Sequence, residues 1–436
     1  MQSWLRFDRL TGLILLIGIL QYGPTVFSGF QQGSVSTFEF ESFALEDAGA
    51  LRYIKEAFLV LLSLAWPIWM GSQTFPQPIL RVLNWYLPWL LLVIALGSVA
   101  FLLDYSPIFF VWSGLRWVTL MHASFGLFLL SKCSLDKNIS QQSIATLCLC
   151  LGAADLAFAL QQLAELSVAW GAKFAEARVT GFFGHAGPAA FFGFSLALIC
   201  MHLDRVSFRI RLAVSGTGFL IALSTGTRSM VIFIFAIVVL QIVEFIELHH
   251  RSFLRKFRNV LFLPVVTIAA LLGYGWLNAI VDRGDLISQQ FEDGRAVNFV
   301  KSIQMLYAAD VGEFVFGRGL GISTNTAYGQ VLAQNITPEI YRFNFLVDNA
   351  ILTTFFQLGL LGSMIFWSGI LLFVAAARPK VGGVFRRRYW LTATLFFAVL
   401  WVGNPFEQYF LMLPFAASLG CAYWAGIAAT SAKVSR

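Results

Sequence analysis

Long apolar segments recur along almost the whole chain. Runs of about 18 to 22 hydrophobic residues begin at Leu10 and continue to Ala429, and each is long enough as a helix to cross a hydrocarbon core of roughly 30 Å. The chain of 436 residues is 58% hydrophobic and only 12% charged, with a mean hydropathy of +0.74, which is too little charge to cover a soluble domain of this size. We therefore expect an all-α polytopic membrane protein that is surrounded by the lipid bilayer.

The apolar segments predict about twelve transmembrane helices in a single multi-pass domain covering residues 1–436. The first segment lacks a small-x-small cleavage site and is followed by many others, so it is expected to be a signal anchor. The expected spans are 10–27, 55–70, 87–103, 107–130, 143–165, 186–203, 209–226, 229–247, 259–280, 349–375, 389–404 and 408–430.

The basic residues are distributed unevenly among the connections between these spans. About nineteen Lys and Arg fall on one alternating set of connections and about ten on the other, and the alternation does not break. The richer set includes "DRVSFRIR" (204–211) and "RPKVGGVFRRR" (378–388). Because cytoplasmic loops carry the excess of positive charge, both termini are expected in the cytoplasm and the 281–347 connection outside. The net charge of +7 is then mostly an orientation signal, and nucleic-acid binding is not expected.

The 281–347 connection, between the ninth and tenth spans, is long enough for a subdomain outside the membrane. Within it, "AVNFVKSIQMLYAAD" (296–310) has apolar residues at helical spacing and is expected to form an amphipathic helix near the surface. The glycines of "FGRGLGIS" (316–323) and the prolyl loop "NITPEIYRF" (335–343) predict irregular structure around it.

Arginines are few on the expected outer side, and their neighbours are informative. Arg178 precedes "VTGFFGHAGPAAFFGF", Arg228 ends "TGTR" between two spans, and Arg295 and Arg318 lie in the long connection. Guanidinium groups suit bidentate contact with phosphate oxygens, and glycines let backbone N–H groups approach an anion. These arginines are candidate ligands for a diphosphate-linked substrate, and the alternative is that each side chain extends to the lipid headgroups.

Arg116 and Asp155 are charged residues within apolar spans. A charge near the middle of a span costs at least about 2.5 kcal/mol on insertion scales, so it normally faces a partner or a wet cavity. Asp155 is the expected partner of Arg116 in a structural ion pair. The alternative is that both residues contribute to an inner substrate cavity, for which His185 and Asn349 are further candidates.

The cysteines give no indication of a metal site. The five residues are scattered, no CxxC pair occurs, and the two thiols of "CLC" (148–150) point in different directions on a helix. They are expected to be packing residues.

Five short elements follow one another between Arg178 and Gly362. In their order and spacing they resemble the O-antigen ligase and polymerase superfamily, which comprises the Wzy-like and WaaL-like membrane proteins. The elements are "RVTGFFGHAGPAAFFG", "STGTRSM", "GRAVNFVKSIQML", "FGRGLGIS" and "DNAILTTFFQLGLLG".

The resemblance implies a GT-C-like, inverting glycosyltransferase that uses undecaprenyl-diphosphate-linked oligosaccharides at the periplasmic face of a bacterial inner membrane. It implies no cofactor and no essential metal, and a chain-length regulator as a further partner. Arginines matching Arg178, Arg228, Arg295 and Arg318 would hold the diphosphate, with Arg295 also counted as catalytic. The residue that deprotonates or orients the acceptor hydroxyl is Asp348 here, where ligases usually have His. This departure favours a polymerase of exopolysaccharide or O-antigen.

Other interpretations remain open at this stage. Asp348 and Asn349 precede an expected helix, and either side chain suits an N-cap that satisfies free N–H groups. A ligase that moves finished glycan onto another acceptor would use the same chemistry. A flippase or transporter for lipid-linked sugars would instead place its charged sites near the midplane, between broken helices.

Overall fold

The structure is a computed structural model that describes most of the expected helices. It describes residues 10–16, 51–71, 73–103, 111–134, 138–170, 181–183, 186–249, 300, 302–305, 307–323, 349–379, 383–406 and 408–434. Every regular element in these residues is helical. The helices are α3 (Leu51–Met70), α4 (Gln77–Leu102), α5 (Val111–Leu130), α6 (Asn138–Trp170), α7 (Ala186–Met201), α8 (Phe208–Ser224), α9 (Arg228–His249), α13 (Val311–Phe316), α16 (Ala350–Ala376), α17 (Val384–Val402) and α18 (Tyr409–Val434), with 3-10 turns η2 (Ser131–Ser134) and η4 (Gly181–Phe183).

The all-helical membrane character is supported by the length and apolarity of these helices. Ten of the twelve expected spans coincide with helices in the described residues. Of the first span only 10–16 are described, and they are helical, whereas 17–27 and the whole of 259–280 lie outside the described residues. The number twelve and the GT-C-like arrangement stay predictions. Five stretches are both long and apolar enough to cross a membrane, namely Gln77–Leu102, Gln141–Gln162, Ser229–Glu247, Ala350–Ala376 and Tyr409–Ala429.

The expected boundaries were wrong by five residues or more for three helices, namely α4, α6 and α17, which begins at Val384 rather than near residue 389. α4 begins at Gln77 rather than near residue 87, because Pro76 and Pro78 flank the helix start, where a missing backbone N–H costs nothing. The helix then continues through Pro88. α6 contains 33 residues and is therefore about 50 Å long, longer than the hydrocarbon core requires.

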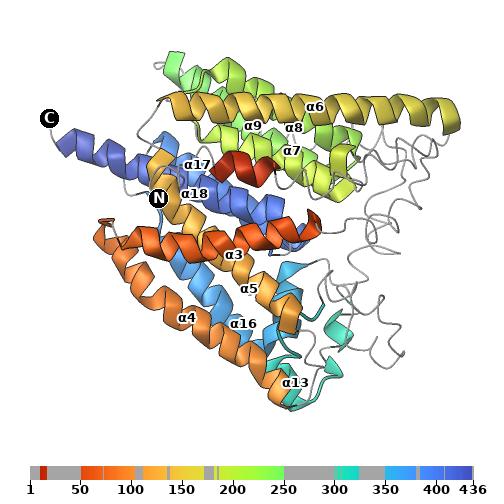
Figure 1. The fold of residues 1–436 in the computed structure, drawn as a ribbon, viewed down its shortest axis with the longest axis vertical. Coiled ribbons are helices and arrows are strands. Elements are labelled where there is room, and N and C mark those ends of the chain that lie inside the picture. The colour runs from red at the N-terminus through yellow and green to blue at the C-terminus, as the bar shows by residue number, and fades with distance from the viewer. Residues whose placement is uncertain are drawn as a thin grey trace.

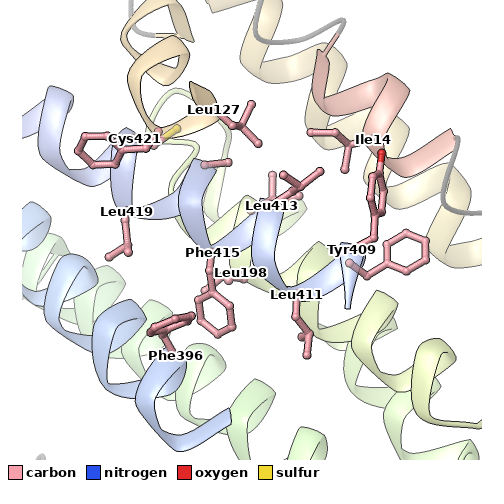
Figure 2. Packing of buried hydrophobic residues seen from close by; sticks show 14 of the residues in the cluster. Ile14, Leu127, Leu198, Phe396, Tyr409, Leu411, Leu413, Phe415, Leu419 and Cys421 are labelled. Carbon is pink, nitrogen blue, oxygen red and sulfur yellow. The ribbon is translucent and has the colours of Figure 1, made fainter. Parts of the chain in front are cut away.

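α18 is the central helix of the bundle. In its apolar stretch 94% of the residues are buried, against 28% to 44% in the other four stretches. It packs against α5 on one side and α7 on another, and α17 lies along it (Figure 1). Figure 2 shows the consequence, because side chains of α18 such as Phe415 and Leu419 lie among Leu127, Leu198 and Phe396 from the surrounding helices.

Two groups of helices flank this centre. Helices α6 to α9 pack together, and α3, α4, α5 and α16 form the other group (Figure 1). α7 and α8 approach closely at Gly193 and Gly218, where a Cβ on either residue would overlap the carbonyl group of the other. Small residues of this kind let helix backbones approach in membranes, where no hydrophobic effect drives helices together.

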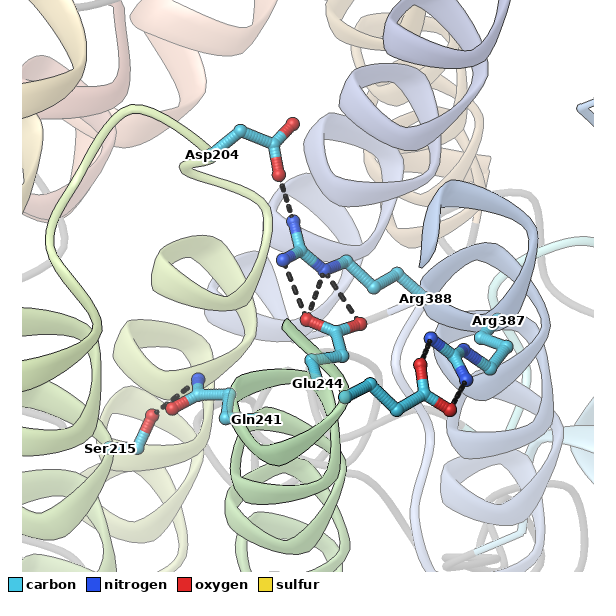
Figure 3. A network of polar contacts seen from close by, with 7 residues as sticks. Asp204, Ser215, Gln241, Glu244, Arg387 and Arg388 are labelled. Carbon is cyan, nitrogen blue, oxygen red and sulfur yellow. Dashed lines mark hydrogen bonds and ion pairs between the residues drawn. The ribbon is translucent and has the colours of Figure 1, made fainter. Parts of the chain in front are cut away.

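A buried ionic cluster joins α9, α17 and the link between α7 and α8 (Figure 3). Arg388 donates to Glu244 through Nη2 at 2.7 Å and Nε at 3.0 Å, and it also pairs with Asp204. Arg387 makes a bidentate pair with Glu247 at 2.7 and 2.6 Å. The pair shows that Asp204 and Arg388, which belong to connections that the charge pattern assigns to one side of the membrane, lie at the same end of the bundle.

We predict that Arg388→Met destabilises the protein strongly, by about 3–5 kcal/mol, because it leaves Glu244 buried without its partner. Glu244 is only 2% exposed, so solvent cannot replace the guanidinium. Thermal unfolding of purified protein in detergent measures the effect. The matched control is Arg387→Met, whose pair with Glu247 is partly exposed and is expected to contribute at most about 1 kcal/mol. Equal losses from the two variants would contradict the structural weight given to Arg388.

Candidate functional site

The N-terminus of α16 directly follows the predicted catalytic residue Asp348. Asn349 precedes the helix, and its Oδ1 accepts hydrogen bonds from the N–H groups of Ile351 at 3.0 Å and Leu352 at 3.1 Å. Its Nδ2 donates to the carbonyl of Trp401 in α17 at 3.4 Å. Asn349 is therefore the N-cap, and both ends of its amide hold α16 in place. It is only 8% exposed, and its predicted place in an inner substrate cavity stays a prediction.

α16 is interrupted at Gly359, well inside the expected span. Gly359 has φ 63° and ψ −168°, so the helix breaks there. Just before the break, the carbonyl of Phe356 accepts from the N–H of Arg318 at 2.7 Å, and the carbonyl of Gln357 accepts from the N–H of Gly319 at 3.1 Å. Because lipid supplies no hydrogen-bond donors, backbone polar groups at a break must be satisfied by protein. We call residues 317–323, which supply these donors, the plug loop.

Glycines on both sides allow the plug loop and the break in α16 to approach closely. Gly317 has φ 79°, and a Cβ on either Gly317 or Gly359 would overlap the backbone nitrogen of the other. The side chain of Gln357 adds a further contact by donating from Nε2 to the carbonyl of Ile322 at 3.0 Å. The glycines of "FGRGLGIS" and the first glycine of "QLGLLG" are thus two halves of one contact.

Leu320 joins the plug loop to two further helices. Its N–H donates to the carbonyl of Gly97 in α4 at 3.1 Å. A Cβ on Gly97, or on Gly114 in α5, would overlap Leu320. The C-terminal part of α4, the N-terminal part of α5 and the N-terminal part of α16 are therefore held together, with α13 beside them (Figure 1).

The guanidinium of Arg318 is engaged within its own segment. Its Nη2 lies 3.2 Å from Oε2 of Glu313, and its guanidinium carbon lies 5.7 Å from the centre of the Phe356 ring. The side chain is only 13% exposed. The structure thus shows Arg318 linking Glu313 to Phe356. A diphosphate would have to compete with Glu313 for the guanidinium, and the role of Arg318 in binding substrate stays a prediction.

The "STGTR" element is a tight turn between α8 and α9. Gly226 has φ 65°, and the N–H of Thr227 donates back to the carbonyl of Ala222 at 3.3 Å, as in a glycine C-cap. Arg228 is the first residue of α9. The turn brings an arginine to a helix start, where backbone N–H groups also favour an anion.

The predicted ion pair between Arg116 and Asp155 was wrong. Nε of Arg116 lies 2.8 Å from Oε1 of Glu56 in α3, and the arginine is in the second turn of α5 rather than near mid-span. Oδ1 of Asp155 instead accepts from the N–H of Phe182 at 2.8 Å. Charge type alone does not select a partner, and Glu56 lies near the start of the second expected span, where its charge is masked by an otherwise apolar segment.

The proposed convergence of arginines with Asp348 is not tested by the described residues. Arg178, His185, Arg295 and Asp348 lie outside them, and the side chain of Arg228 is not described. Of the expected amphipathic helix, residues 302–305 are helical. The described site residues Asn349 and Arg318 both lie on or against α16, one at its capped start and the other about 10 Å further along the helix, before the break.

An apolar pocket lies among α4, α5, α16, α17 and α18. Its lining includes Tyr86, Trp89, Phe125, Phe128 and Phe373. Beside the pocket, the hydroxyl of Tyr86 lies 3.1 Å from Nδ1 of His122. A cavity of this chemistry suits hydrocarbon and not a sugar diphosphate. Among the described residues, no three His, Cys, Asp or Glu side chains gather as metal ligands.

Comparison with known proteins adds no relative. No family model matches the chain, and no curated protein and no solved structure is significantly similar to it.

We predict that Gly359→Ala prevents normal folding of the N-terminal part of α16, because the added Cβ meets the plug-loop backbone. Gly383→Ala is the matched control, because Gly383 also has a positive φ of 97° but has open space around its Cα. The control is expected to lose only the strain of a left-handed residue, about 1–2 kcal/mol. Size-exclusion profiles and melting temperatures of the two purified variants measure the difference. A Gly359→Ala protein as stable as the control would show that the plug loop does not occupy the break.

Proposed function

We propose that this protein is a bacterial inner-membrane polysaccharide polymerase that joins undecaprenyl-diphosphate-linked oligosaccharide repeat units at the periplasmic face. The observation that carries the proposal is the order of the five elements between Arg178 and Gly362. Three of them have specialised backbone in the described residues, namely the "STGTR" turn, the plug loop and the capped, broken α16. Such structure supports a site built from several connections.

The chemistry follows from the residue types. The acceptor hydroxyl oxygen attacks the anomeric carbon of the donor sugar, and the bond between that carbon and the diphosphate oxygen breaks. The electron pair leaves with the diphosphate, whose growing charge Arg178, Arg228 and Arg295 would stabilise. The proton of the acceptor hydroxyl goes to Asp348 as general base, a role that contributes typically about 10²–10⁴-fold. Attack from the face opposite the diphosphate inverts the anomeric centre.

The N-cap supports this role for Asp348 indirectly. An Asp or Asn before a helix is commonly needed as the cap, and Asn349 fills that position with two accepted hydrogen bonds. This cap therefore does not require the carboxylate of Asp348, so capping does not compete with the proposed role of that residue.

The break in α16 favours group transfer over transport. Transporters use unwound helices because freed carbonyls coordinate ions or substrate. Here the carbonyls of Phe356 and Gln357 are occupied by N–H groups of the plug loop at 2.7 and 3.1 Å. The break is thus a closed structural joint rather than an open ion site.

We predict that Asp348→Ala and Arg295→Ala abolish polymer in cells while leaving the amount of membrane-inserted protein unchanged. The first variant removes the base and the second removes a cation from the leaving group. Arg209→Ala is the matched control, because Arg209 is exposed at the expected cytoplasmic start of α8 and should leave polymer length normal. Gel profiles of extracted polysaccharide give the result. Normal polymer length in either site variant would remove that residue from the mechanism.

An assay with the purified protein separates the related functions. Lipid-linked repeat units reconstituted with the protein should give longer chains and release undecaprenyl diphosphate. Transfer of glycan only to an added second acceptor would identify a ligase. Movement of the lipid-linked sugar across the bilayer without release of diphosphate would identify a flippase.

A further inference from the structure

Three residues on α6 form one face of that helix. Asp155, Phe158 and Gln162 are spaced i, i+3 and i+7, so they line up along two turns. We call them the α6 platform. Asp155 is fully buried in an otherwise apolar stretch, and a carboxylate in such a place is expensive and calls for a function.

All three residues of the platform hold the turn η4. The N–H of Gly181 donates to Oε1 of Gln162 at 3.0 Å, and the carbonyl of Gly181 accepts from Nε2 of the same side chain at 3.3 Å. The N–H of Phe182 donates to Oδ1 of Asp155 at 2.8 Å. The rings of Phe158 and Phe182 stack at 5.2 Å between centroids. The hydrogen bonds and the ring stacking together hold Gly181 and Phe182 against α6.

The fit is specific for glycine at position 181. Gly181 has φ 55°, and a Cβ there would overlap the carboxylate of Asp155. On the other side of the turn, Phe183 is fully buried and packs against Phe192 and Phe410. The turn is therefore clamped between the α6 platform and the core formed with α7 and α18.

We infer that the α6 platform is a positioning device for the proposed diphosphate site. Arg178 precedes Gly181 by three residues in the sequence, so a turn fixed at Gly181 and Phe182 limits where that arginine can reach. Asp155 and Gln162 are positioning residues in this scheme, and they act through the turn rather than on the substrate. The inference rests on the proposed function, because it assigns the purpose of a contact within that site.

The hydrogen bond to Phe182, rather than the charge of Asp155, is the element that positions the turn. Oδ2 of Asp155 has no hydrogen-bond partner among the described residues. An asparagine keeps an oxygen acceptor for Phe182 and loses no bond at the second position. Asp155→Asn should therefore restore what Asp155→Leu removes.

The test measures steady-state kinetics of the full-length protein in nanodiscs with undecaprenyl-diphosphate-linked repeat units. Asp155→Leu, Gln162→Ala and Gly181→Ala are expected to raise KM for the lipid-linked donor by about 10- to 100-fold, as expected for a misplaced binding group, with a smaller change in kcat. Asp155→Asn should stay within about twofold of the wild type. Gly216→Ala, at a glycine with open space around it, is the control for a glycine substitution and should be unchanged.

A second measurement keeps the inference separate from the proposed function. Hydrogen–deuterium exchange at the N–H of Phe182 should be faster in Asp155→Leu than in the wild type and in Asp155→Asn. If the wild type makes no polymer, the proposed function fails, and unchanged exchange in Asp155→Leu would overturn the platform as well. With active protein, an Asp155→Asn variant as impaired as Asp155→Leu, or a Gly181→Ala variant with wild-type KM, would overturn the positioning role.

Discussion

The need to satisfy backbone polar groups inside a membrane explains how the helices around the start of α16 are held together. α16 breaks at Gly359, and the plug loop donates to the carbonyls of Phe356 and Gln357 next to that break. Water cannot serve this purpose in hydrocarbon, so a distant segment of the chain must. The same loop then places Leu320 against α4 and α5, which ties three helices to one another at one end. The break in α16 therefore determines how α4, α5 and α16 are held together.

The two ends of the bundle are stabilised by different physics. At one end Arg388, Glu244 and Asp204 form a buried ionic cluster that joins α9, α17 and the α7–α8 link. At the other end, backbone hydrogen bonds and glycine contacts around α16 join the helices. The central helix α18 is almost fully buried between these two ends. A scaffold fixed in this way at both ends would suit the proposed glycosyl transfer, because groups that need not move on reaction stabilise a transition state most effectively.

Several side chains that the sequence indicates as functional make structural contacts in the described residues. Arg318 is held by Glu313 and Phe356, Arg116 by Glu56, and Asn349 caps α16. The predicted roles of Arg318 and Asn349 in a substrate site stay predictions beside these contacts. The contacts also change the meaning of Asp155, which supports the turn after Arg178 instead of neutralising Arg116.

Composition and apolar run length were sufficient to predict a helical membrane protein, because the hydrocarbon thickness imposes one helix length on every span. The charge pattern likewise predicted that 204–211 and 378–388 share one end, because loop charge follows orientation. The sequence did not predict which residues contact one another between helices. That Arg116 meets Glu56, or that Gly317 meets Gly359, depends on which helices become neighbours, and residue type carries no information about that. The membrane therefore dictated the elements through local composition, whereas only packing in three dimensions decided which polar groups satisfy one another.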